Sequence, residues 1–230
     1  MGALKPDLRR NTKTDLTAPR DVRHRRLLTV TGVTGIAYTV SWIAGLAVAA
    51  PSPKLTASGA SITAALAGHQ AAVVAQFALT EGLPAVGLAV ISIALARAAR
   101  RSGAGHARVA LVAGLAAALI SLAQFVLGAI LAAAASPAAA HLLYESVNRL
   151  DGVKMLALAG VAACFIATRN PAARQPRWLA VTAVAMAVAL VASGVTYVAL
   201  ANPLAWTAFV SGPLLLIWVA GTGIWLTRRA

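Results

Sequence analysis

Acidic residues and cysteine are scarce in this 230-residue chain, which has six Asp and Glu residues and one cysteine. Because Cys164 has no partner, the chain can form neither an internal disulfide nor a Cys-x-x-Cys metal site. Charged residues make up 11% of the sequence, whereas a soluble globular domain has about 25%. With 60% hydrophobic residues, this composition excludes an ordinary soluble domain and indicates an integral membrane protein.

Long apolar runs occupy most of the chain. About 20 apolar residues can cross a hydrocarbon core of about 30 Å. The runs do not alternate apolar and polar residues, as the strands of a membrane β-barrel would, so we expect helices. The predicted fold is all-α, one transmembrane domain (28–227) of six antiparallel helices. The expected spans are 28–50, 70–96, 109–135, 142–168, 178–200 and 204–226.

Basic residues gather on one side of these spans. Seventeen of the 20 Lys and Arg residues lie in residues 1–27, in the connections 97–108 and 169–177, or at the C-terminal end. The connections on the opposite side hold only Lys54. This asymmetry predicts that both termini are cytoplasmic and that the protein is a multi-pass protein of the plasma membrane.

Residues 1–27 form a basic segment with few apolar residues, which we expect to be a disordered cytoplasmic tail. Such a tail binds anionic lipid, and it lacks the interleaved aromatic residues of a nucleic-acid-binding segment. An alternative concerns the first span, where Ala47 and Ala49 resemble a signal-peptidase site. Cleavage there would leave five spans.

The second span contains several polar residues. Gln76, Thr80 and Glu81 lie in it, followed by Pro84. Pro84 cannot donate a backbone hydrogen bond to residue 80, so the helix should open beside the Glu81 carboxylate. Irregular backbone at membrane depth is tolerated where it faces protein or water, so we expect Glu81 to point inward.

Polar residues of three spans lie at similar expected depths. The helical rise places Glu81 about 12 Å and Lys154 about 9 Å below the outer surface. Gln124 of the third span reaches a comparable level. An unpaired charge in lipid costs at least about 2.5 to 3.5 kcal/mol, so these side chains should meet inside the bundle.

The fourth span begins with a charged stretch. Glu145 and Arg149 are four residues apart, and Asp151 and Lys154 are three apart, so both pairs can close on the helix surface. The stretch is either one wall of an outward-facing polar pocket, or an amphipathic shoulder with Lys154 reaching up to the interface. The predicted ligand-binding residues, none of them catalytic, are Gln76, Glu81, Gln124, Glu145, Arg149, Asp151 and Lys154.

Other motifs give little indication of function. His69 and His141 lie near outer span ends and are weak candidates for a metal or a bis-histidine haem, although we expect no cofactor. The sequence contains no P-loop, His-Glu-x-x-His or Gly-x-Ser-x-Gly motif. Ala-Gln-Phe occurs at residues 75–77 and again at 123–125, which is too short to establish an internal repeat.

Four stretches, three of them largely hydrophobic, resemble a broad bacterial family of six-helix membrane proteins classified as a domain of unknown function. These are TGVTGIAYTVSWIAGL, the turn RAARRSG, PRWLAVTAV and the closing IWVAGTGIWLTRR. The resemblance covers nearly all of residues 28–229, and the alanine and arginine content is similar to that of actinobacterial proteins. It implies six membrane helices and supplies no catalytic residues.

Three functions are compatible with these features. The first is a non-enzymatic small-ligand-binding or regulatory bundle, whose outward-facing pocket includes Glu81, Gln124, Asp151 and Lys154. The second is a proton-coupled transporter in which Glu81 titrates, since intramembrane acids often serve this purpose. The third is an intramembrane enzyme acting on a lipid or isoprenoid, with Glu81 or Asp151 as general acid. The sequence specifies neither a protein partner nor an oligomeric state.

Overall fold

The computed structural model describes residues 18–100, 103–168, 175–201 and 206–228, with side chains of the first helix described from Val30 onward. Every regular element in these ranges is a helix. Six of the helical segments are long and apolar enough to cross a membrane. This confirms the predicted all-α class and is consistent with a multi-pass membrane protein.

The second span is built from three consecutive elements and each other span from one helix. Span ends lie within five residues of the predicted ones, except at the start of the first helix. The elements are α1 (Ala18–Ala47), α2 (Gly59–Leu66), α3 (Gln70–Phe77), η1 (Ala78–Gly82), α4 (Leu83–Ala99), α5 (Ala104–Ala132), α6 (Pro137–Ala167), α7 (Arg177–Ala199) and α8 (Ala208–Thr227).

Helix α1 begins before its apolar run. Residues 18–27 belong to the segment expected to be a disordered tail, yet they are helical. Pro19 lies in the first turn, where a missing N–H has no helical partner to lose, and no further proline interrupts the helix. The helix therefore extends beyond its apolar part. The rest of the expected tail, residues 1–17, lies outside the described residues.

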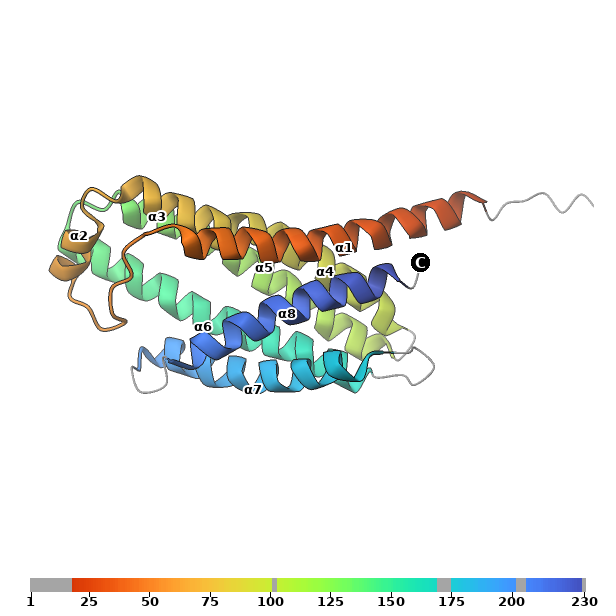
Figure 1. Cartoon of the computed structure of the whole chain (residues 1–230). Coiled ribbons are helices and arrows are strands. Elements are labelled where there is room, and N and C mark those ends of the chain that lie inside the picture. The colour runs from red at the N-terminus through yellow and green to blue at the C-terminus, as the bar shows by residue number, and fades with distance from the viewer. Residues whose placement is uncertain (1–17, 101–102, 169–174, 202–205, 229–230) are drawn as a thin grey trace, which may run out of the picture.

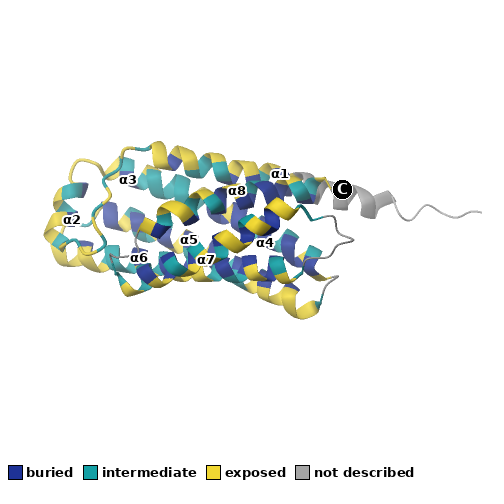
Figure 2. Cartoon of the chain, turned by 60° about the horizontal axis from the view of Figure 1, so that its bottom comes forward, coloured by how far each residue is buried: buried dark blue, intermediate teal, exposed yellow. Residues whose placement is uncertain are grey.

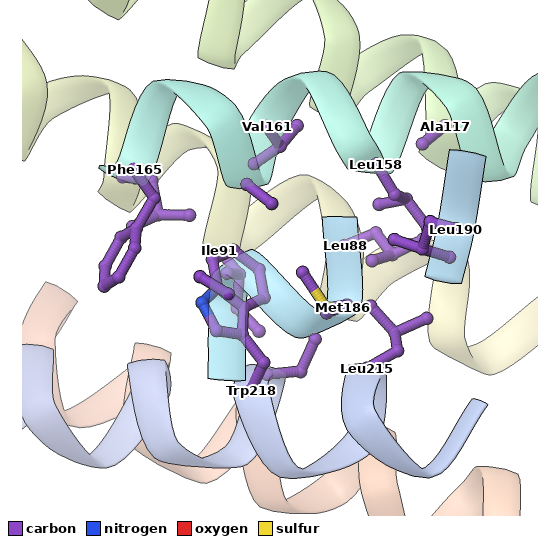
Figure 3. Packing of buried hydrophobic residues seen from close by; sticks show 14 of the residues in the cluster. Leu88, Ile91, Ala117, Leu158, Val161, Phe165, Met186, Leu190, Leu215 and Trp218 are labelled. Atoms are coloured by element: carbon purple, nitrogen blue, oxygen red, sulfur yellow. The ribbon is translucent and has the colours of Figure 1, made fainter. Parts of the chain in front are cut away.

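The six spans form a ring around one core. Each span packs against its neighbours in the sequence, and α1 packs against α8, which closes the ring (Figure 1). Large side chains such as Trp218, Met186 and Leu190 fill the interior (Figure 3). Exposed residues cover the outside of the bundle (Figure 2). They include apolar side chains such as Val181 and Phe209, as expected for a surface that faces lipid.

Helices α6 and α7 are in backbone contact through a pair of glycines. A Cβ atom added to Gly152 would lie 2.6 Å from the carbonyl oxygen of Gly194. A Cβ atom added to Gly194 would lie 2.9 Å from the carbonyl oxygen of Gly152. Any side chain at either position would force the two helices apart, so glycine is required for this close approach.

Residues 48–69 connect α1 to α3 and contain the short helix α2, which the sequence did not predict. The Ser58 hydroxyl caps α2 by accepting a hydrogen bond of 3.3 Å from the backbone N–H of Ser61. Ile62 and Leu66 are buried in a second, smaller apolar cluster that includes Leu131 of α5. This connection therefore packs on one end of the bundle, which we call the α2 end (Figure 1).

Candidate functional site

Glu81 lies in a single turn of π-helix. Element η1 interrupts the second span between α3 and α4, and the N–H of Leu83 donates to the carbonyl of Ala78, five residues earlier. Pro84 follows and has no N–H with which to continue an α-helical ladder. The helix is thus opened where the sequence predicts it, and Glu81 is only 7% exposed.

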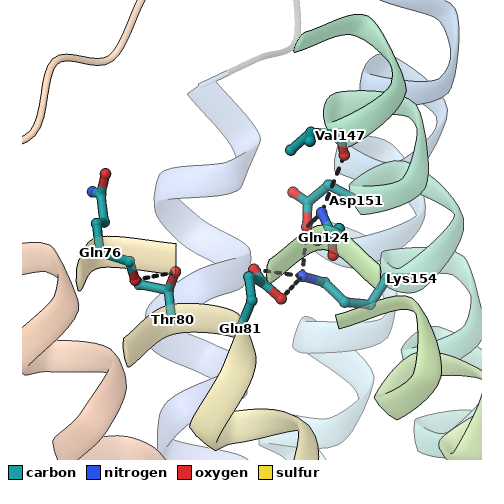
Figure 4. Close-up of polar contacts among 7 residues, drawn as sticks. All are labelled: Gln76, Thr80, Glu81, Gln124, Val147, Asp151 and Lys154. Atoms are coloured by element: carbon teal, nitrogen blue, oxygen red, sulfur yellow. Dashed lines mark hydrogen bonds and ion pairs between the residues drawn. The ribbon is translucent and has the colours of Figure 1, made fainter. Parts of the chain in front are cut away.

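The Glu81 carboxylate binds the ammonium group of Lys154 on α6. Nζ of Lys154 donates to both Glu81 oxygens, at 2.8 and 2.7 Å (Figure 4). The same Nζ lies 2.7 Å from Oδ1 of Asp151, one turn earlier on α6. The three ammonium protons therefore have three carboxylate acceptors, and the amino group is fully satisfied.

Gln124 of α5 contacts the Asp151 carboxylate and the backbone of α6. Its Nε2 donates to the Val147 carbonyl at 3.1 Å and to Oδ1 of Asp151 at 3.3 Å. These two donations fix the orientation of the amide. Its Oε1 is buried and has no hydrogen-bond partner among the described residues. We call Glu81, Gln124, Asp151 and Lys154 the charged centre.

Side chains of two further helices surround the charged centre. The Ser121 hydroxyl, one turn from Gln124 on α5, is close enough to donate a hydrogen bond to the Glu81 carboxylate. Tyr38 of α1 is buried and interacts electrostatically with the charges of the centre. Tyr197 of α7 lies within electrostatic range of Asp151 and Lys154. The centre therefore lies inside the bundle, where α1, η1, α5, α6 and α7 all contribute.

Three of the predicted ligand-binding residues lie outside the charged centre. Gln76 stands apart from it (Figure 4), and its backbone carbonyl accepts a hydrogen bond from Thr80. Arg149 is exposed. The predicted Glu145–Arg149 ion pair is not formed in the described structure. Oε1 of Glu145 lies 3.8 Å from Nε2 of His141 instead. Helical side chains lean toward the N-terminus, so Glu145 reaches back toward residue 141.

Two phenylalanines pack reciprocally onto two glycines between the second and third spans. A Cβ atom on Gly128 would lie 2.3 Å from the ring of Phe77, and one on Gly82 would lie 3.3 Å from the ring of Phe125. These phenylalanines end the two Ala-Gln-Phe segments. In the sequence, each Ala-Gln-Phe segment is followed by a glycine within five residues. That pattern alone does not predict that the two helix faces carrying these residues pack against each other.

In the described structure, the contacts of the two candidate metal-ligating histidines are with residues outside the charged centre. Nδ1 of His69 lies 3.0 Å from the carbonyl oxygen of Ala67, and His141 contacts Glu145. Within the described ranges, no group of three or more His, Cys, Asp or Glu residues is arranged to hold a metal ion.

Polar residues continue from the charged centre toward the α2 end. His141, Tyr144, Asn148 and Asp151 recur at intervals of three or four residues, which places them along one face of α6. The Asn148 amide donates to the Tyr144 carbonyl at 2.8 Å, and the Tyr144 hydroxyl donates to the carbonyl of Pro53 in the α1–α3 connection. We call these four residues the α6 polar stripe.

Comparison with family models, curated proteins and solved structures finds no match for this chain. The resemblance to a six-helix bacterial family therefore remains an expectation from sequence.

Proposed function

We propose that this protein is a non-enzymatic membrane bundle that binds a small ligand at the charged centre. The observation that supports this most directly is the position of the Lys154 ammonium group between the carboxylates of Glu81 and Asp151, inside an apolar bundle. The ligand would reach the centre from the α2 end along the α6 polar stripe.

Stability alone does not account for this arrangement. Replacing a buried ion pair by apolar side chains of similar volume is often neutral, or stabilises a protein by about 1 to 4 kcal/mol. Three charged side chains between packed helices are therefore a costly way to hold α6 against η1. Ionisable residues inside membrane proteins commonly belong to binding or transport sites.

The backbone of η1 supports the same proposal. Single π-helical turns inside α-helices are rare and frequently occur at functional sites. Here the π-helical turn carries Glu81 itself. A small change in that turn would move the Glu81 carboxylate relative to Lys154, whereas an unbroken α-helix would hold it at a fixed angle.

The orientation of the bundle is part of the proposal. Six antiparallel spans with the basic connections inside would place both termini in the cytoplasm and the α2 end outside the plasma membrane. His141 and Glu145 lie near the start of α6, at the α2 end. Their side chains are 49% and 31% exposed, which agrees with a polar entrance at that end.

Thiol accessibility tests this entrance. We would replace Cys164 by serine and then introduce Asn148→Cys in the polar stripe or, as a matched control on the same helix, Val153→Cys. Val153 is 45% exposed on the apolar surface of the bundle. A membrane-impermeant cationic methanethiosulfonate added outside should modify position 148 and leave 153 unmodified, because a thiol in lipid does not ionise. Equal protection of both cysteines would reject outward access to the centre.

A proton-coupled transporter is the second candidate. Two irregular spans favour it: η1 interrupts the second span, and α8, although continuous, contains Pro213 inside the helix. Transport sites are typically formed by discontinuous helices near the bilayer midplane. In proteoliposomes with an imposed pH gradient, a transporter would move protons, and Glu81→Gln would stop that movement. Proton movement that persists unchanged in Glu81→Gln would exclude Glu81 as the titrating group of such a transporter.

A further inference from the structure

The charged centre has unequal numbers of positive and negative groups. Glu81 and Asp151 contribute two carboxylates, and Lys154 contributes one ammonium group. In the described structure, the charges that act on Glu81 are those of Lys154 and Asp151. The other surrounding side chains, Tyr38 and Ser121 among them, are neutral. With all three groups ionised, the centre has a formal charge of −1.

Gln124 provides a second and independent observation. Its side chain points into the centre, toward Asp151 and Lys154 (Figure 4). Because its Nε2 donates to Val147 and Asp151, the acceptor that remains is Oε1, which has no donor among the described residues. Gln124 is 2% exposed. A buried carbonyl oxygen of this kind requires either a donor or a cation.

We infer that the ligand of the charged centre is a small monovalent cation, held by the carboxylate of Asp151 and by Oε1 of Gln124. This inference depends on the proposed ligand-binding function and specifies its ligand class. One positive charge would neutralise the centre. A monovalent anion would make its charge more negative, −2, and a divalent cation would make it +1. Carboxylate and amide oxygens are suitable ligands for hard cations and for ammonium groups.

The cation binds beside Lys154 and does not replace it. Lys154 already has three carboxylate contacts, and displacing it would leave an ammonium group unpaired inside the bundle. Asp151 is the accessible partner: its side chain is 21% exposed, against 10% for Glu81 and for Lys154. Asp151 also belongs to the α6 polar stripe, along which the cation would arrive.

Thermal unfolding of the purified full chain in detergent tests the inference. Sodium, potassium and ammonium chloride would be titrated at constant pH, with choline chloride holding the ionic strength fixed, so that screening is the same in every sample. A bound cation raises the midpoint temperature saturably, because it stabilises the folded state according to its occupancy. Choline, which is too large for a site between packed side chains, should have no specific effect.

Variants locate the site. Asp151→Asn and Gln124→Leu should each abolish the cation-specific shift, whereas Glu145→Gln, outside the centre, should retain it. Lys154→Met leaves two unpaired carboxylates and should lower the half-saturating cation concentration at least about tenfold. If Asp151→Asn fails to fold, Gln124→Leu and Lys154→Met still test the inference, since they change the same site in opposite directions.

Each outcome has one meaning. A shift of equal size with choline, or one that persists in Gln124→Leu, would overturn the inference. A midpoint temperature that depends on pH but on none of the added cations would identify the proton as occupant and would also overturn it. Modification of Asn148→Cys without any cation effect would reject the cation while leaving the ligand-binding function in place. Protection of that cysteine would reject outward access and, with it, the ligand-binding function as proposed.

Discussion

Lys154 donates hydrogen bonds of 2.8 and 2.7 Å to the two carboxylate oxygens of Glu81, 73 positions earlier in the chain. Both residues are buried. The contact joins the π-helical turn of the second span to the middle of α6, which are far apart in sequence. It also brings Lys154 and Asp151, neighbours on one helix, into contact with an acid from another helix.

Loss of the Glu81 charge should destabilise the protein. Glu81→Gln leaves Lys154 with one carboxylate, and breaking a buried pair in this way should cost about 3 kcal/mol, the lower part of the usual range because Asp151 remains bound. Glu145→Gln is the matched control, since the exposed pair that it removes is worth about 0 to 1 kcal/mol. Thermal unfolding in detergent measures both. Similar midpoint temperatures for the two variants would show that the Glu81–Lys154 contact contributes little.

A methyl group at Gly128 should disturb the contact between the second and third spans. In Gly128→Ala the new Cβ would lie 2.3 Å from the Phe77 ring, which has to move at a cost of about 1 to 3 kcal/mol. Phe77→Leu in the same chain should recover part of that loss. Gly105→Ala, on the same helix with nothing within 4 Å of its Cβ, should be neutral or slightly stabilising. An unchanged midpoint temperature in Gly128→Ala would contradict the close packing.

The Tyr144 hydroxyl should hold the α1–α3 connection against α6. Tyr144→Phe removes its hydrogen bond to Pro53, worth about 1 kcal/mol, and leaves the ring in place. We expect faster amide hydrogen exchange in residues 54–58 with little change in global stability. Thr182→Val also removes a hydroxyl, from an exposed position on α7, and should leave exchange in residues 54–58 unaltered. Unchanged exchange in Tyr144→Phe would show that other contacts hold the connection.

The orientation of the bundle can be read from single cysteines. In the Cys164→Ser background, Lys54→Cys should react with an impermeant thiol reagent on intact cells, because the basic connections are expected inside. Arg97→Cys should react only after permeabilisation. Both positions are exposed. The reverse pattern would place the α2 end in the cytoplasm.

Most of the fold could be predicted from one property, the length of the apolar runs, because a long helix satisfies its own backbone hydrogen bonds in lipid. The interruption beside Glu81 was also predictable, since Pro84 removes a specific donor. Helix α2 was not: Gly59–Leu66 is too short to produce a periodic signal, and it is stabilised by burial of Ile62 and Leu66 on the bundle.

The candidate site was predictable in depth but not in lateral position. Helical rise put Glu81, Gln124 and Lys154 at similar heights. In the structure Lys154 binds Glu81, and Asp151 contacts both Lys154 and Gln124. The same reasoning could not separate Gln76 from them, because the face of a helix that turns inward depends on its neighbours. For Glu145, spacing allowed two partners, and only the direction of the side chain decides between His141 and Arg149.

The glycine contact between α6 and α7 has a mechanical consequence for the charged centre. Gly152 lies between Asp151 and Lys154, and its backbone lies close to that of Gly194, so this part of α6 has little room to rotate or slide toward α7. Lys154 and Asp151 therefore lie on a part of α6 that is held rigidly against α7. Glu81, by contrast, lies in the π-helical turn η1, where the regular α-helical hydrogen bonds are already interrupted. If the centre changes shape when a ligand binds, we expect the second span to move and α6 to stay in place. Distances between spin labels should then change between η1 and α6, and stay constant between α6 and α7.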